Sequence, residues 1–340
     1  MKFREAVCDA TRLAMEKDSS VFVIGVGIID PRKVWGTLSG IREQFGDRRF
    51  IEVGLAEDAL TGVSVGAATH GLRPIIVHHR IDFVLLTMNQ LINHAAKWSE
   101  MFGRQQSVPL VVRAVVGRGW GNGPQHTQSL HALFSHVPGL KAVVPTNPTD
   151  AKGLLLAAIE DDGPVIYIEH RWLHEDDAPV PPGYYVTPLG KAAVVRTGTD
   201  ATIAAVGPMV AEAMKAAAAL EQTGLSAEVL DMRTLRPLDS DTVIQSVVKT
   251  GRLVVAEGDW SPCSVGGEIV ARVAEQALSA LKAAPVRIMW PDICVPSSQT
   301  IEAKFYPGAR EIQNAVMSVC NHYSQGQTIQ NTVKKFDGPF

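Results

Sequence analysis

The sequence has little that would connect it with nucleic acid, a membrane or an oxidising compartment. Among 340 residues, 32 Lys and Arg stand against 35 Asp and Glu, so the net charge of −3 leaves no basic surplus for a polyanion. The longest apolar run in the first 185 residues, around 153–159, is far too short to cross a bilayer. The N-terminus mixes acids with bases and lacks the apolar core of a signal peptide.

Cysteine is scarce as well. The four cysteines are scattered and form no close pair, which argues against a metal-ligand set or a disulfide framework: Cys8, Cys263, Cys294 and Cys320. A reducing cytoplasm fits this usage best. We therefore expect a cytoplasmic protein that binds neither nucleic acid nor membrane.

Short universal catalytic motifs are also missing. The sequence contains no G-x-S-x-G, no H-E-x-x-H and no P-loop lysine motif. The run GRGWGNG (117–123) departs from the dinucleotide fingerprint, because Asn122 replaces the third glycine. A loop that lets the backbone approach a ligand is the better interpretation of these glycines.

Buried strands alternating with helical stretches are the dominant pattern. Short runs rich in Val and Ile predict strands at 21–26, 74–77, 109–116, 141–144 and 164–168, and again at 202–206, 227–231 and 252–256. Helices are expected between them, at 57–70, 85–102, 209–222 and 265–283. This alternation predicts an α/β protein with mostly parallel sheets flanked by helices.

The chain length and one linker-like stretch suit two domains. Residues 174–190 cluster acids, prolines and glycines, which is a linker composition. We expect a first domain at 1–185, a second at 186–323 and a polar tail at 324–340. The residues by themselves support no more than a two-domain α/β enzyme or enzyme subunit.

Longer motifs resemble a known family. The run QHTQSLHALFSHVPGLKAVVPTNPTDAKGLL (Gln125 to Leu155) is similar to a signature of the β subunits of thiamine-diphosphate-dependent pyruvate and branched-chain 2-oxoacid dehydrogenases. Ala56 to Ile75, Asp82 to Trp98, Glu228 to Asp239 and Lys249 to Trp260 resemble the same family. The resemblance implies a pyrimidine-binding domain followed by a transketolase C-terminal-type domain.

Glu57 is the first residue that the resemblance marks as catalytic. Thiamine diphosphate reacts as a thiazolium ylide, and its aminopyrimidine must tautomerise to remove that proton. A buried carboxyl group on the far ring nitrogen would drive this change. Without the resemblance, a glutamate in the first turn of a helix would simply complement the helix dipole.

The other site residues follow from the same resemblance. It places His126 near the thiazolium end, where a histidine can handle the substrate carboxylate and acyl transfer. It places Phe83 against the aminopyrimidine ring, although an ordinary core phenylalanine would look the same. A structural potassium ion is implied at a loop whose carbonyls and one carboxylate would be ligands: Leu110, Ala158, Ile159, Asp161 and Gly163. A helix end followed by an Asp-Gly turn is the simpler alternative for that loop.

Three departures from the family are visible. Val26 follows Gly25 where many members have an acid, which puts coupling between paired active sites in doubt. His78-His79-Arg80 replaces apolar or neutral residues; on an extended strand His79, Ile81 and Phe83 would share a face near the cofactor, with Arg80 opposite. The segment PDICVPSSQ (291–299) lacks a family tyrosine, so docking on an acyltransferase core is in doubt.

The diphosphate-binding half of the site is missing. Thiamine diphosphate enzymes hold the diphosphate through magnesium with a Gly-Asp-Gly motif, and no such tripeptide occurs here. We therefore expect an α-type partner chain to supply it, in an α2β2 assembly that decarboxylates a 2-oxoacid and transfers the acyl group to a lipoyl group. The alternatives are half of a split transketolase or acyloin-forming synthase, and a scaffolding subunit without catalytic residues of its own.

Overall fold

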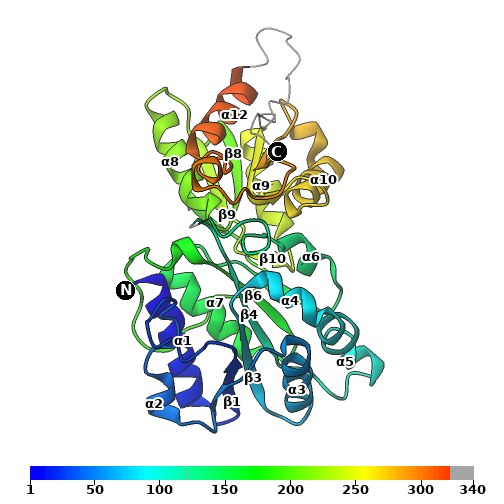
Figure 1. Ribbon diagram of the computed structural model, residues 1–340. Helices are drawn as coiled ribbons and strands as arrows, with labels where there is room; N and C mark the ends of the chain where they lie inside the picture. The colour runs from blue at the N-terminus through cyan, green and yellow to red at the C-terminus, as the bar shows by residue number, and fades with distance from the viewer. Residues whose placement is uncertain (120, 322–340) are drawn as a thin grey trace. The chain divides into compact units, whose positions relative to one another are not determined.

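The computed structural model describes residues 1–119 and 121–321, so Trp120 and the predicted tail lie outside it (Figure 1). The chain divides into two compact units. The first contains residues 1–118 and 133–189, and the second contains residues 119–132 and 190 onward. The segment 119–132 thus groups with residues that follow it by more than fifty positions, although it lies between two parts of the first unit.

The first unit is built on a parallel sheet. Its strands lie in the order β5 (Lys141–Val143), β6 (Val165–His170), β4 (Val111–Val116), β3 (Arg73–His78), β1 (Val21–Gly25) and β2 (Phe50–Glu52). All pairings among them are parallel. The central strands are buried along their whole length, which is why they appear in the sequence as unbroken apolar runs.

Helices cover this sheet. They are α1 (Phe3–Lys17), α2 (Ile41–Phe45), α3 (Glu57–Thr69), α4 (Ile81–Val84), α5 (Trp98–Met101), α6 (His131–His136), which starts in the second unit, and α7 (Pro148–Glu160), with η1 (Leu85–Thr87), η2 (Asn89–Ala95) and η3 (Arg171–Leu173). Helices α1 and α7 pack side by side and share one apolar core with β1 (Figure 1). Asn147 caps α7 by accepting the Asp150 N–H, and Pro148 occupies the first helical position.

The second unit has its own sheet, in the order β12 (Val286–Trp290), β11 (Leu253–Trp260), β8 (Ala201–Val206), β9 (Ala227–Asp231) and β7 (Ala193–Arg196). The short strand β10 (Thr234–Arg236) also belongs to this unit but is not part of that sheet. Only the pairing of β7 with β9 is antiparallel among those described. Its helices are α8 (Met209–Glu221), α9 (Ser240–Thr250), α10 (Val265–Ala277), η4 (Leu278–Ala280), α11 (Gln299–Glu302) and α12 (Ala309–Asn321). Helices α8 and α12 share a core, and α9 packs against α10.

The expected α/β architecture with two mostly parallel sheets is confirmed. The expected helix at 85–102 is wrong in detail, because this stretch is divided into the 3-10 segment η1, the π-helical segment η2 and the short α5. The expected extended strand through Phe83 is also wrong, since β3 ends at His78 and α4 begins at Ile81. In the described ranges no helix is long and apolar enough to cross a membrane.

Candidate functional site

Loops gather at the carboxyl edge of the first sheet. The carboxyl ends of parallel strands meet at the same edge, which is where open α/β sheets bind ligands. Strand β3 is followed there by His79 and Arg80, and β6 by Arg171. Trp35, on the long loop after β1, lies against all three residues.

The ring of His79 stacks on Trp35, with centroids 4.4 Å apart and planes within 9°. Although His79 as a whole is only partly buried, both ring nitrogens are shielded from solvent and make no hydrogen bond with a described residue. Burial lowers the pKa of His79 to about 3 and that of His78 to about 4, so both are neutral near pH 7.

Arg80 lies on the same side as His79, which corrects the expectation that it would lie opposite. Its guanidinium carbon is 5.9 Å from the Trp35 ring centre, and that of Arg171 is 5.6 Å away. The reason is that the strand ends at His78, so residues 79–83 no longer alternate between two faces. At this edge of the sheet the ring of Trp35 is therefore flanked by two half-buried cations, Arg80 and Arg171.

Glu57 is the first residue of α3 and is half-buried in this chain. No side chain caps the helix at Ala56, and Asp58 is a second acid in the same turn. The neighbouring small residues Ala56 and Ala59 are exposed, and so is Leu55, at 82%. The carboxyl group of Glu57 therefore stands at the edge of an open, partly apolar surface.

Phe83 and His126 fall in different units. Phe83 lies on α4 and is partly buried, in the segment that leads into η1, which packs against α3. His126 lies in a turn of the second unit, where its N–H donates to Gly123 O at 3.3 Å. The first unit thus brings together the elements that carry Glu57, His79 and Phe83, and the second unit carries His126.

The loop expected to hold potassium is bound by cations of the chain itself. Arg73 donates to the carbonyl oxygens of Ile159 (2.9 Å) and Asp161 (3.1 Å). The Asp161 carboxylate accepts from Gly163 N–H (2.7 Å) and pairs with Lys141. Because two basic side chains already hold these oxygens, the residues do not fit an additional monovalent cation.

A buried ion pair that the sequence did not reveal lies inside the first unit. Arg113 on β4 donates through Nε to Glu169 on β6 at 2.7 Å, and both are fully buried. His174 Nε2 is 3.4 Å from the other carboxylate oxygen. Burial alone would raise the pKa of Glu169, but Arg113 and His174 together outweigh it and lower that pKa to about 2.

A second buried cluster, in the second unit, has carboxylates but no such cation. It consists of His131, Glu257 and Asp259, whose ligating atoms all lie within 4.8 Å of one another. Burial raises the pKa of Asp259 to about 8 and that of Glu257 to about 7, and it lowers the pKa of His131 to about 3. The 3.9 Å approach of His131 Nδ1 to Asp259 Oδ2 is therefore not an ion pair.

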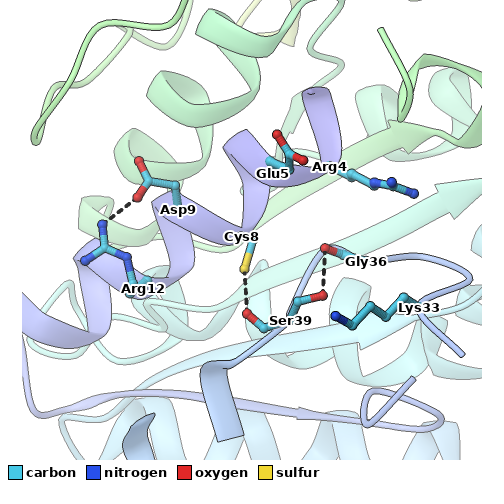
Figure 2. Close-up of a pocket in the computed structure, with 8 residues that line it drawn as sticks. All are labelled: Arg4, Glu5, Cys8, Asp9, Arg12, Lys33, Gly36 and Ser39. Carbon is cyan, nitrogen blue, oxygen red and sulfur yellow. Dashed lines mark hydrogen bonds and ion pairs between the residues drawn. The ribbon is translucent and has the colours of Figure 1, made fainter. Parts of the chain in front are cut away.

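A cavity of about 520 Å³ opens between α1 and the loop after β1 (Figure 2). Its charges are largely paired within the chain: Arg12 contacts Asp9 at 2.5 Å, and Lys152 contacts the same carboxylate at 2.8 Å. Cys8 donates to Ser39 O, and burial raises the pKa of its thiol to about 11, so it is no nucleophile at neutral pH. None of the expected site residues lines this cavity.

Comparison with known families covers most of the chain. Residues 1–175 match the transketolase pyrimidine-binding domain, and residues 190–312 match the transketolase C-terminal domain. Among solved structures, a split-gene transketolase in an inactive β4 tetramer aligns with a TM-score of 0.79 and 23% identity over 94% of this chain and 98% of that one. A likeness at that identity shows the fold alone.

Curated relatives are closer in sequence. The β subunit of acetoin:2,6-dichlorophenolindophenol oxidoreductase from Cupriavidus necator is 41% identical, over 93% of this chain and 96% of the relative. The pyruvate dehydrogenase E1 β subunit of Rhizobium meliloti is also 41% identical, over 94% and 70% of the two chains. The 2-oxoisovalerate dehydrogenase β subunit of Bacillus subtilis is 39% identical, over 93% and 97%. The chain therefore belongs to the transketolase-like family of β subunits of thiamine-diphosphate-dependent 2-oxoacid dehydrogenases.

Proposed function

We propose that this chain supplies the pyrimidine half of a thiamine diphosphate site and that an α-type chain completes it. The observation that carries the proposal is a pyrimidine-binding domain matched over 175 residues in a sequence that has no Gly-Asp-Gly tripeptide. The partner would hold magnesium and the diphosphate. The reaction would be decarboxylation of a 2-oxoacid, with transfer of the acyl unit to a lipoyl group in the cytoplasm.

Glu57 suits the role of the carboxyl group that contacts the aminopyrimidine. It begins a helix whose exposed neighbours Ala56 and Ala59 leave room for a ring, and it stands beside the element that leads on from Phe83. The cofactor, when bound, supplies the carbon nucleophile and the electron sink. Glu57 would hold and exchange a proton at the ring nitrogen, Phe83 would pack on the ring, and His126 would donate a hydrogen bond or proton to the substrate.

Exposed apolar side chains near Glu57 support the proposal that a partner chain binds to this part of the surface. Large apolar side chains on or beside α3, η1 and α5 remain exposed: Leu55, Val63, Leu85, Leu86, Met101 and Phe102. Monomeric proteins rarely leave so many grouped on adjoining elements. We propose that the α-type chain covers them in an α2β2 assembly and that a dihydrolipoyl acyltransferase core is a further partner.

A second candidate is cleavage of an acyloin, because relatives named for acetoin are as similar to this chain as those named for pyruvate. The arginines Arg80 and Arg171 at the sheet edge favour an anionic substrate over neutral acetoin. Assays of the reconstituted complex with pyruvate, 2-oxoisovalerate and acetoin, with dichlorophenolindophenol as acceptor, separate the two. If the complex converts acetoin but neither of the two 2-oxoacids, acyloin cleavage replaces 2-oxoacid decarboxylation as the function.

Glu57→Gln in the reconstituted complex tests the mechanism. Glutamine keeps the size and a hydrogen bond but cannot exchange the proton, so deuterium exchange at the thiazolium carbon should slow roughly 100-fold or more. Asp58→Asn, in the same helix turn, is the matched control and should exchange at the wild-type rate. This chain without its partner should show no tight cofactor binding by calorimetry.

Exchange at the wild-type rate in Glu57→Gln, with the cofactor bound, would make Glu57 an ordinary acid at a helix start. Tight binding of thiamine diphosphate by the isolated chain would instead refute the shared site.

A further inference from the structure

The cluster of His131, Glu257 and Asp259 has no role in the function proposed above. Glu257 and Asp259 are two residues apart on β11, so their side chains project from one face of the strand. The pairing of β11 with β12 is irregular at this point, between Ala256 and Trp260. His131 reaches the same place from the start of α6, more than a hundred residues earlier in the chain.

Hydrogen bonds from the backbone fix both carboxylates. Gly266 N–H donates to Glu257 Oε2 at 2.7 Å, and Trp260 N–H donates to Asp259 Oδ1 at 2.8 Å. Glu257 Oε1 is fully buried and accepts a hydrogen bond from no described residue. An acceptor that is buried without a partner in a native protein requires an explanation, and an ion is one of the standard ones.

The distances suit ligands of one ion. A separation of 3.9 Å between His131 Nδ1 and Asp259 Oδ2 is too long for a hydrogen bond. Bonds of about 2.0–2.2 Å to a shared tetrahedral zinc ion place two ligands roughly 3.3–3.6 Å apart. With every pair of ligating atoms within 4.8 Å, a pair at that limit has to close by roughly 1.2–1.5 Å around such an ion, which side-chain rotation can supply.

The donor set indicates the class of ion. One imidazole nitrogen with two carboxylates suits zinc and similar divalent transition metals, whereas calcium and magnesium prefer oxygen alone. The Ser129 hydroxyl lies within hydrogen-bond distance of both ring nitrogens of His131, 3.1 Å from Nδ1 and 3.3 Å from Nε2, so an ion bound through one nitrogen leaves it the other. All three side chains are nearly or fully buried, so an ion held between them would be shielded from bulk solvent.

We propose that His131, Glu257 and Asp259 form a structural zinc-type site in the second unit. The ion supplies positive charge beside two buried carboxylates that form no ion pair with a described lysine or arginine, since Arg287 acts on Glu257 only at longer range. It connects the segment 119–132, which includes His126, to strand β11. The proposal is independent of the reaction and of the α-type partner.

Metal analysis of the full chain tests the site. After expression with added zinc and dialysis against metal-free buffer, mass spectrometry should find about one zinc per chain. His131→Gln and Asp259→Asn should each lose it. Glu302→Gln is the matched control, because Glu302 is another buried carboxylate of the second unit but accepts from Gly119 N–H (2.7 Å) and Tyr306 OH (3.0 Å). This variant should keep its zinc.

Cobalt substitution keeps the test decisive if the variants fail to fold. Wild-type chain loaded with Co²⁺ should show visible d–d absorption without the near-ultraviolet band of thiolate ligation. A thiolate band would show that a cysteine binds the ion, and the exposed Cys263 and Cys294 would be the candidates. Such a band, zinc below about a tenth of an equivalent, or full retention by both ligand variants would each overturn the proposal.

Discussion

The two units handle buried charge in opposite ways. In the first unit Glu169 is fully buried, but Arg113 pairs with it and its pKa falls to about 2. In the second unit Glu257 is equally buried and forms no ion pair with a described basic side chain; Arg287 offsets the effect of burial only in part, and the pKa of Glu257 rises to about 7. Burial is the same in both cases, so the partner decides the charge state.

This difference distinguishes buried carboxylates that receive a cationic partner from the same chain from those that do not. Arg113 supplies the charge that Glu169 needs in the first cluster, although both terminal nitrogens of its guanidinium donate to no described residue, and Arg73 with Lys141 holds the oxygens at the loop of Asp161. In the cluster of Glu257, Asp259 and His131, the negative charge of the two carboxylates must be neutralised by bound protons or by an ion from solution. Four substitutions test this contrast.

Arg113→Met should have the largest effect. Removing one partner of a buried ion pair leaves an uncompensated charge, so the free energy of unfolding should fall by roughly 3–5 kcal/mol. Urea unfolding of the full chain measures it, and adding Glu169→Gln should recover much of the loss. If Arg113→Met is as stable as the wild type, the pair does not stabilise the first unit.

Arg73→Ala should cost about 2 kcal/mol, because it removes charge-assisted hydrogen bonds from a mostly buried guanidinium to two carbonyl groups. The wild type should melt at the same temperature in potassium and in sodium chloride at equal ionic strength. Only the variant should gain stability from potassium. Stabilisation of the wild type by potassium would show that an ion binds beside Arg73 after all.

His79→Phe should change the pH dependence of stability. Because burial lowers the folded-state pKa of His79 to about 3, the unfolded chain binds the extra proton below about pH 6.5. The neutral histidine's full stability is therefore present above that pH and is lost on acidification, by about 1.4 kcal/mol per pH unit. Phenylalanine keeps the stacking on Trp35. Between pH 6.5 and 5, the slope of the free energy of unfolding against pH should be smaller in this variant by that amount.

Unfolding curves at several pH values give this slope, and the exposed His70 provides the control, as His70→Asn. An unchanged slope in His79→Phe would mean that its ring is protonated in the folded state.

Asp259→Asn in zinc-free protein should have the smallest effect, below about 1 kcal/mol at pH 7. Burial and the neighbouring Glu257 raise the pKa of Asp259 to about 8, so a neutral amide replaces a group that is mostly neutral already. Thermal melts after chelation provide the measurement. If Asp259→Asn loses as much stability as Arg113→Met, the carboxylates of the second unit are charged like Glu169, and the two units do not differ in this respect.

The sheets could be predicted because their strands are buried on both faces. Runs such as VFVIG and VVRAVV contain almost no polar residue, so their positions were visible within two or three residues at each end. The stretch from His79 to Trp98 could not be predicted in this way. Its apolar residues suit either a strand or a helix, and the packing of η1 and η2 against α3 selects short helical pieces.

The polar clusters depend on contacts that are distant in sequence. Nothing near Glu169 points to Arg113, and nothing near Asp259 points to His131, because each pair is separated by more than fifty residues. The roles of Glu57, Phe83 and His126 came from the family resemblance, since an acid at a helix start or an aromatic in a helix carries no such signal by itself.

The grouping of residues 119–132 with the second unit also limits how the gene can be divided. A fragment that ends at Leu189 would carry this segment without the strands that it belongs with. A fragment that begins at Gly190 would lack His131, and its two strand carboxylates would have to fold without their histidine. Because the two units alternate along the chain, no single cut separates them, whether the chain keeps its order or is circularly permuted.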